Sequence, residues 1–219
     1  TWKAVEPRPG SYDDDYLARV RRTVRMLDDH GIVSLLDFHQ DLYHERFQGE
    51  GAPDWAVQDD GLPAQPQLGF PGNYFAMAAM WRAFDHFWAN DAGPGGVGLQ
   101  DRYAAAWRHV AAAFRDTPGV QGIDLFNEPF PGSEWETCLN VVGCPAYDAK
   151  LQEFSQRAID AIDSLFEASG GRALATGTYL QRAWRDAHAG RVHAANDPER
   201  ALQMYGAHEF GHKVDPGMY

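Results

Sequence analysis

Two short apolar runs, separated by a long segment, constrain the fold of this chain most strongly. They are "IVSLLDF" at residues 32–38 and "VQGIDLF" at residues 120–126. Runs of this length, rich in β-branched and aliphatic residues, are typical of parallel strands that are buried on both faces. Helical patterns lie between them and no hairpin signal joins them, so we predict a parallel α/β fold.

Amphipathic helices are predicted around these strands, because apolar residues recur at steps of three and four positions. The predicted helices lie within residues 11–31, 73–88, 103–118 and 151–165. The first has a start at Ser11 that resembles a capping box, and Asn73 is expected to cap the second.

Two weaker strand patterns follow, at residues 172–178 and 201–210. No glycine-rich phosphate-binding loop follows any strand, which disfavours an open nucleotide-binding sheet. We therefore expect a (β/α)8 TIM barrel, in which reacting groups stand at the C-terminal ends of the strands. The whole chain, residues 1–219, is expected to form one barrel domain that is truncated at both ends.

Polar side chains follow three of the predicted strands. Such groups are costly to bury, and three that converge on one rim favour a catalytic site over ordinary hydrogen-bonded structure. The residues are His39, Gln40, Asp41, Asn127, Glu128, His208 and Glu209.

Glu128 is the strongest candidate among these polar residues. A carboxyl group at the mouth of an apolar barrel, beside an amide, is expected to have a raised pKa and to donate a proton to a leaving oxygen. Asn127 is suited to hydrogen-bond a sugar 2-hydroxyl group, a contact that strengthens in an oxocarbenium-like transition state. The pair resembles half of a glycosidase carboxylate site.

The composition limits the partners of the protein. A net charge of −12 disfavours nucleic acid and anionic membrane surfaces, because both require basic patches. No apolar run approaches the roughly 20 residues that span a bilayer. Aromatic residues make up 13% of the chain, which suits stacking on sugars but also suits helix–sheet packing. Cys138 and Cys144 match no zinc motif, and a local disulfide is slightly favoured over two free thiols.

Long sequence blocks carry a resemblance to a known family. "LFNEPF" resembles the Asn-Glu-Pro strand of glycoside hydrolase family 5, and "LLDFHQDLY", "GEGAPDWAV" and "MWRAFDHFW" narrow the resemblance to endoglycoceramidases and related glycolipid hydrolases. "TWKAVEPRPGSYD" matches the second strand of that family and the turn after it. The resemblance covers residues 1–165 and becomes thin beyond them.

The resemblance implies a retaining hydrolase of glycosphingolipid catabolism that releases a glycan from ceramide or a related lipid. It implies Glu128 as the general acid/base, Asn127 as the 2-hydroxyl partner, and His39, Gln40 and Asp41 around the reacting sugar. It also implies a secreted protein that is monomeric when complete, binds a glycolipid or oligosaccharide, and needs no cofactor or metal.

Further contacts with substrate are expected at the edges of this site. Lys3, in "TWK", is a weaker candidate for a sugar contact from the second strand. Four aromatic residues of the irregular segments are expected to meet a lipid tail or a sugar face, unless they pack the loops themselves: Phe47, Trp55, Phe70 and Phe130.

"HEFGH", at residues 208–212, has three interpretations. It fits the zinc-peptidase pattern H-E-x-x-H, but Pro216 would interrupt the helix and no clear third ligand follows. Family 5 nucleophiles often precede an aromatic residue and Gly, which would make Glu209 the nucleophile. Strand counting favours instead a sixth strand that ends in His208, with Phe210 replacing the Tyr of that family.

If that count holds, the chain carries about strands 2–6 of a barrel, and the nucleophile lies outside it. Retaining hydrolysis needs two carboxyl groups, so we expect this chain alone to be inactive. Two other functions stay open. One is a β-glucanase or β-glucosidase of the same family that acts on non-lipid substrates, and the other is an inactive barrel that binds glycan or lipid.

Overall fold

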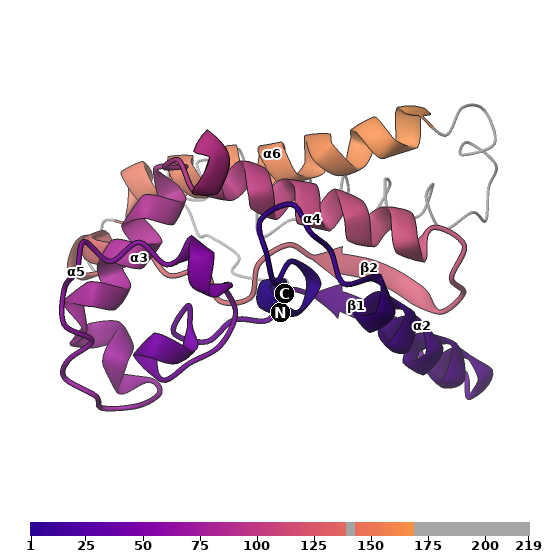
Figure 1. Cartoon of the computed structure of the whole chain (residues 1–219), viewed down its shortest axis with the longest axis horizontal. Coiled ribbons are helices and arrows are strands. Elements are labelled where there is room, and N and C mark those ends of the chain that lie inside the picture. Colours follow the sequence, from indigo (N-terminus) through magenta and orange to yellow (C-terminus); the bar gives the residue numbers. More distant parts are fainter. Residues whose placement is uncertain (139–142, 169–219) are drawn as a thin grey trace, which may run out of the picture.

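A computed structural model describes residues 1–138 and 143–168 of the chain (Figure 1). Within these residues, five α-helices precede a sixth that is the longest of them. In chain order, the helices and strands are α1 (Trp2–Val5), α2 (Asp14–Asp29), β1 (Ser34–Asp37), α3 (Ala78–Trp88), α4 (Leu99–Phe114), β2 (Val120–Asp124), α5 (Trp135–Cys138) and α6 (Pro145–Ala168). Short 3-10 turns lie between them, at Glu45–Phe47, Asp54–Ala56, Gly72–Phe75, Pro94–Gly96 and Gly132–Glu134.

The two predicted strands are present, and they pair in parallel. Leu35 lies opposite Gly122, and Asp37 lies opposite Asp124. The parallel α/β prediction is therefore confirmed for the described part of the chain. That part holds an open sheet of two strands, so the closed barrel stays a prediction.

Helices cover one face of the strand pair. α4 runs beside the strands and α6 runs beside α4, while α2 contacts both β1 and α4 (Figure 1). Leu36 is buried, whereas its neighbour Leu35 on the opposite face is 62% exposed. Among the described residues, the second face of β1 is thus uncovered, unlike the expected strand that is buried on both faces.

Aromatic side chains form the core between the strands and the helices. The ring of Phe38 stacks on that of Trp107, with centroids 4.0 Å apart. The Trp107 indole N–H and the Tyr103 hydroxyl both donate to the carbonyl of Leu125 at 2.9 Å. These contacts fasten the end of β2 to α4, so the residues that follow β2 start from a fixed position.

The first residues of the chain form a helical turn and not the expected second strand. The Thr1 hydroxyl accepts a hydrogen bond from the backbone N–H of Ala4, which caps α1. Trp2 is buried, and its indole N–H donates to the Glu6 carboxylate at 2.9 Å. The local cap and this anchored indole stabilise a helical turn, which the apolar pattern of the segment did not reveal.

Two predicted helix caps are also wrong. The cap of α2 is Asp13 rather than Ser11, because the Asp13 side chain accepts from the backbone N–H of Tyr16. Asn73 lies in the turn Gly72–Phe75, before α3, and the N-cap residue of α3 is Met77. The Asn73 amide is fully buried and donates to the carbonyl of Phe47 at 2.8 Å, so it fixes the long loop instead.

The expected bridge between Cys138 and Cys144 is present and links the end of α5 to the start of α6. No helix within residues 1–138 and 143–168 is both long and apolar enough to cross a membrane. The predicted strands at residues 172–178 and 201–210 lie outside the described residues.

Candidate functional site

The ends of β1 and β2 meet, and a reciprocal set of hydrogen bonds joins them. The Gln40 side-chain amide donates to the backbone carbonyls of Asn127 and Glu128, at 2.9 and 3.0 Å. In return, the Asn127 side-chain amide donates to the backbone carbonyl of Gln40 at 2.9 Å. The prediction that these two polar strand ends converge is therefore confirmed, although they are 87 residues apart in sequence.

His39 lies between two carboxylates at this junction. Its Nδ1 is 3.0 Å from Asp37 Oδ2, and its Nε2 is 3.3 Å from Asp41 Oδ2. Partial burial lowers the pKa of His39, but the hydrogen bond to Asp37 and the charges of Asp37 and Asp41 outweigh it, so the pKa is raised. Both ring nitrogens thus have an acidic partner, which stabilises the protonated form relative to an isolated histidine.

Asp37 is a site residue that the sequence reasoning missed. Burial is the largest cause of its raised pKa, the nearby charge of Asp124 adds to it, and the hydrogen bond from His39 opposes it. The signal was available in "LLDFH": an Asp inside an apolar strand, two positions before a His, must lie on the same face as that His.

Tyr74, from the long loop, is a second residue that the sequence reasoning missed. Its hydroxyl accepts from the backbone N–H of Leu42 at 3.0 Å and lies 3.5 Å from the Gln40 amide. Burial raises the pKa of Tyr74, and the charges of Asp41 and Glu128 raise it further. Tyr74 therefore lies within electrostatic reach of both strand ends, but no periodic pattern in the loop pointed to it.

Gln40 and Glu128 differ sharply in their exposure. Gln40 is 4% exposed and its amide is already used in backbone hydrogen bonds, so the structure does not support it as a direct sugar contact. The Glu128 side chain is exposed, and the described residues do not enclose it as the expected barrel mouth would. Its backbone has a φ of +41°, which is uncommon for a residue with a side chain.

Lys3 lies in a separate cluster of charges at the surface. Its ammonium group donates to Glu45 and Asp54, both at 2.8 Å, beside an open hollow of about 670 Å³. The hydrogen bond to Asp54 is the largest cause of the raised pKa of Lys3, and the same bond, with one from His44, lowers the pKa of Asp54 to about 2. The described contacts of Lys3 are thus with carboxylates, and its expected role toward sugar stays a prediction.

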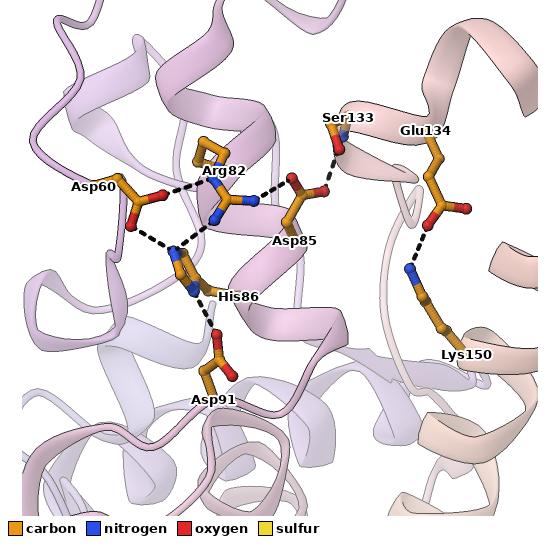
Figure 2. Close-up of polar contacts among 8 residues, drawn as sticks. All are labelled: Asp60, Arg82, Asp85, His86, Asp91, Ser133, Glu134 and Lys150. Atoms are coloured by element: carbon orange, nitrogen blue, oxygen red, sulfur yellow. Dashed lines mark hydrogen bonds and ion pairs between the residues drawn. The ribbon is translucent and has the colours of Figure 1, made fainter.

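The long loop is held on α3 by a second charged network (Figure 2). Asp60 of the loop binds Arg82 Nε at 2.7 Å and His86 Nε2 at 2.9 Å. The other ring nitrogen of His86 contacts Asp91, and Arg82 also binds Asp85 at 2.9 Å. Asp85 then accepts from the backbone N–H of Ser133, so α3 joins the loops that follow both strands (Figure 2).

Only one of the four expected aromatic contacts is largely exposed. Phe70 is 59% exposed, whereas Phe47 is fully buried in the core and packs the loop. Trp55 and Phe130 are partly buried and pack against core residues. Leu68 and Phe75, which were not expected at the site, are 61% and 48% exposed and flank Phe70 along the chain.

Groups of metal-ligand type occur at two places near these clusters. His39, Asp41 and Glu50 form one group, and His44, Glu45 and Asp54 form the other, each with potential ligand atoms within 4.8 Å of one another. In both groups the histidine already contacts an acidic partner. His208 and Glu209 lie outside the described residues, so the structure places neither of them.

Endoglycoceramidases resemble most of this chain. The chain is 34% identical over 162 residues to Endoglycoceramidase I from Rhodococcus hoagii (strain 103S), a match that covers 74% of this chain and 32% of that protein. The structure resembles Endo-glycoceramidase II from Rhodococcus sp. in its cellobiose-like imidazole complex, with a TM-score of 0.64 and 41% identity, over 74% of this chain and 36% of that chain. Other structures of that enzyme are a lactosyl-enzyme intermediate and a ganglioside GM3 complex. This chain therefore spans about a third of the length of these relatives.

A later part of the chain resembles proteins of another kind. The family model for the acyl-CoA dehydrogenase C-terminal domain matches residues 151–198, which begin inside α6. The chain is also 76% identical over 55 residues to the flavin-dependent monooxygenase, oxygenase subunit HsaA, of Rhodococcus jostii (strain RHA1), which covers 25% of this chain and 14% of that protein. Residues 172–178, expected to form a barrel strand, therefore also match the acyl-CoA dehydrogenase C-terminal domain.

The two kinds of relative account for the chain in unequal shares. The endoglycoceramidase match covers 74% of it, and the motifs at both described strand ends come from the blocks that resemble that family. Over 74% of its length, the chain is therefore homologous to the endoglycoceramidases.

Proposed function

We propose that the protein carrying these residues is a retaining glycoside hydrolase of family 5 that cleaves the bond between a glycan and a lipid aglycone. The observation that carries the proposal is the junction of "NEP" with "HQD", where Asn127 and Glu128 meet the strand end of His39. Support for retention comes from the relative that was captured as a lactosyl-enzyme intermediate, because a covalent glycosyl-enzyme is the hallmark of retaining hydrolysis.

In the proposed mechanism, Glu128 protonates the oxygen of the leaving aglycone and later removes a proton from the attacking water. Asn127 binds the sugar 2-hydroxyl group, and His39 and Asp41 contact the same sugar. We assign no nucleophile among the described residues. Glu209 stays the alternative within the chain, and it lies outside them.

A lipid aglycone fits the exposed apolar residues beside this junction. Phe70 packs edge-on against Tyr74 at 6.0 Å, and Tyr74 in turn contacts Gln40 and Leu42. Phe70, which is 59% exposed, is thus linked through Tyr74 to the strand ends and offers an apolar contact for an alkyl chain. A β-glucosidase of non-lipid substrates and an inactive binding barrel remain the alternatives.

The barrel is proposed on related grounds. The uncovered face of β1, with Leu35 62% exposed, is the face that a barrel interior would bury. Secretion is supported by the disulfide between Cys138 and Cys144, since disulfides persist in oxidising compartments. We also propose that this chain by itself does not turn over substrate, because retaining hydrolysis needs a second, well-placed carboxyl group.

The deciding experiment compares the complete gene product with its Glu128→Gln variant on a lactosyl lipid that carries a fluorescent ceramide. We expect Glu128→Gln to lose activity by about 10²- to 10⁴-fold, the usual contribution of a general acid. Glu136→Gln is the matched control, because it makes the same change at another exposed glutamate. A metal chelator should have no effect.

Other outcomes separate the alternatives. Cleavage of simple β-glucosides without cleavage of the lipid would retain the chemistry and reject the substrate. Binding of glycan without turnover by the wild-type protein would indicate the inactive barrel. Full activity in Glu128→Gln would reject Glu128 as the acid/base.

We also infer, as an alternative to a continuous barrel, that the residues after α6 derive from the monooxygenase relatives. In that alternative the later barrel strands are missing, Glu209 is not a nucleophile, and no turnover is expected. The match to the monooxygenase is 76% identical over 55 residues, far above the 34% identity of the match to the endoglycoceramidase. The first match covers 25% of this chain and the second covers 74%, so the two can lie one after the other. The inference predicts that chain 1–168 unfolds at the same urea concentration as chain 1–219. A clear loss of stability on truncation would instead support barrel strands at 172–178 and 201–210.

A further inference from the structure

Gln40 uses every polar atom of its side chain on backbone groups around the strand junction. Its Nε2 donates to the carbonyls of Asn127 and Glu128, and its Oε1 accepts from the backbone N–H of Tyr43 at 2.9 Å. The side chain is 4% exposed. A buried amide with all of its partners satisfied defines a single geometry, because any displacement would leave several polar groups unpaired.

The backbone that Gln40 touches is strained on both sides of the junction. Glu128 has a φ of +41°, and Tyr43 has a φ of +71°. Left-handed backbone is unfavourable for a residue with a Cβ, and it persists only where surrounding contacts hold it. The carbonyl of Glu128 accepts a hydrogen bond from the buried Gln40 amide, and the backbone N–H of Tyr43 donates one to it.

The direction of the Glu128 carboxyl group depends on this backbone. Its side chain is exposed, so packing around the carboxyl group does not determine its direction. We propose that Gln40 is a positioning residue for Glu128: its amide holds the carbonyls of Asn127 and Glu128, and thereby the left-handed turn that aims the carboxyl group. The proposal rests on the function proposed above, in which Glu128 protonates the leaving group.

Mispositioning of an acid has a specific kinetic signature. A glycoside whose leaving group is a dinitrophenolate departs without protonation, whereas an alkyl or lipid alcohol requires the proton. Damage to the aim of Glu128 should therefore reduce cleavage of a lactosyl lipid far more than cleavage of dinitrophenyl lactoside. General structural damage should reduce both alike.

Gln40→Glu is the sharpest change, because a carboxylate has the same shape but cannot donate to the two carbonyls. Gln100→Glu is a matched control in α4. Gln100 is 2% exposed and its amide donates to the consecutive carbonyls of Phe87 and Trp88, at 2.9 and 3.2 Å. The same chemical damage is thus made at a buried glutamine that does not touch Asn127 or Glu128. Gln40→Met, which is neutral, covers the case in which the introduced charge prevents folding.

In the complete gene product, we expect Gln40→Glu to lower kcat/KM about 100-fold on the lactosyl lipid, the scale of a displacement near 1 Å. On dinitrophenyl lactoside the loss should stay within about 3-fold, which is about half the free energy of a tenfold change. Gln100→Glu should affect both substrates equally. Equal losses for both substrates in Gln40→Glu and Gln40→Met, or no loss in either variant, would overturn the proposal.

A crystal structure of the Gln40→Met variant supplies a readout that does not depend on activity. Departure of Glu128 from its left-handed φ would support the positioning role, and an unchanged φ with an unchanged carboxyl direction would overturn it. If the wild-type protein cleaves neither lactoside, the proposed function fails. The structural comparison then still decides whether Gln40 holds the turn.

Discussion

The strand junction and the rim of the long loop are both held by polar contacts, but of opposite kinds. At the junction, Gln40 and Asn127 exchange neutral hydrogen bonds with the backbone across 87 residues, and Gln40 is 4% exposed. At the rim, which consists of the charged pairs of Lys3 and Asp60, the contacts lie at the surface. The side chains of Lys3 and its partner Asp54 are 37% and 78% exposed. Both sets fasten segments that are distant in sequence.

The difference decides what each region can do. Neutral buried bonds do not titrate, and breaking one leaves an unpaired polar group, so the hydrogen bonds of Gln40 and Asn127 are rigid and insensitive to pH, unlike the contacts of His39 beside them. Exposed ion pairs are screened by salt and contribute little stability, so the rim adjusts to its conditions. A site with this arrangement keeps the direction of its acid fixed while the surrounding loop responds to pH.

The largest effect on stability should come from Tyr74→Phe. The change removes the acceptor of the Leu42 backbone N–H, which is buried, and leaves that donor unpaired. We expect the free energy of unfolding to fall by about 1–3 kcal/mol, the cost of one buried unsatisfied group. The fall should be the same between about pH 5 and pH 8, the range in which histidine titrates. Urea unfolding measures it, with Tyr16→Phe as a control at a partly exposed tyrosine.

A smaller, pH-dependent effect is expected for His86→Gln. Burial lowers the pKa of His86, but hydrogen bonds to Asp91 and Asp60 outweigh it, and the charge of Arg82 opposes them, so the pKa lies above 6.5. Only the protonated ring can donate from both nitrogens to the two carboxylates. A pKa that is raised on folding stabilises the protein fully at pH values below the unfolded pKa, and this contribution is lost as the pH rises through the folded pKa.

The measurement is urea unfolding of wild type and His86→Gln at several pH values. The difference between the two proteins should be largest in acid and should shrink above about pH 6.5, the ordinary pKa of histidine. Tyr74→Phe, measured alongside, should show no such trend. A difference that grows with pH would mean that the ring acts in its neutral form, and the contrast between junction and rim would then fail.

The smallest effect is expected for Lys3→Met. Lys3 pairs with Glu45 and Asp54 at the surface, and exposed pairs contribute at most about 1 kcal/mol. High salt should remove most of that difference. A loss as large as that of Tyr74→Phe would show that the rim is as rigid as the junction. A raised KM with unchanged stability would support the predicted contact of Lys3 with sugar.

Much of the fold followed from patterns that are local in sequence. The apolar runs at 32–38 and 120–126 became β1 and β2, and three- and four-residue periodicity located α4 and most of α6. The errors arose where tertiary contacts outweighed the local signal. Asn73 has the composition of a helix cap, but its amide is buried against the carbonyl of Phe47. "TWK" reads as a strand, but a local cap and a buried indole give a helical turn.

The candidate site divides along the same line. Residue type and position at strand ends identified Asn127, Glu128 and His39, because parallel strands place such groups on one rim. Tyr74 was missed, since it reaches the site from an irregular loop without periodicity. Gln40 was found, but its contacts with the carbonyls of Asn127 and Glu128 were not, because a sequence shows which groups an amide carries and not which of them is buried.

By itself, the sequence determined the two strands, the helices between them, the polar residues at the strand ends and the resemblance to glycolipid hydrolases. These depend on periodicity and on motifs within a few residues, which local physics controls. The tertiary structure alone decided that Gln40 holds the turn at Glu128, that Tyr74 joins the site and that the rim relies on exposed charge. Each of these depends on burial and on partners that are distant in sequence, and only the folded chain brings them within hydrogen-bonding distance.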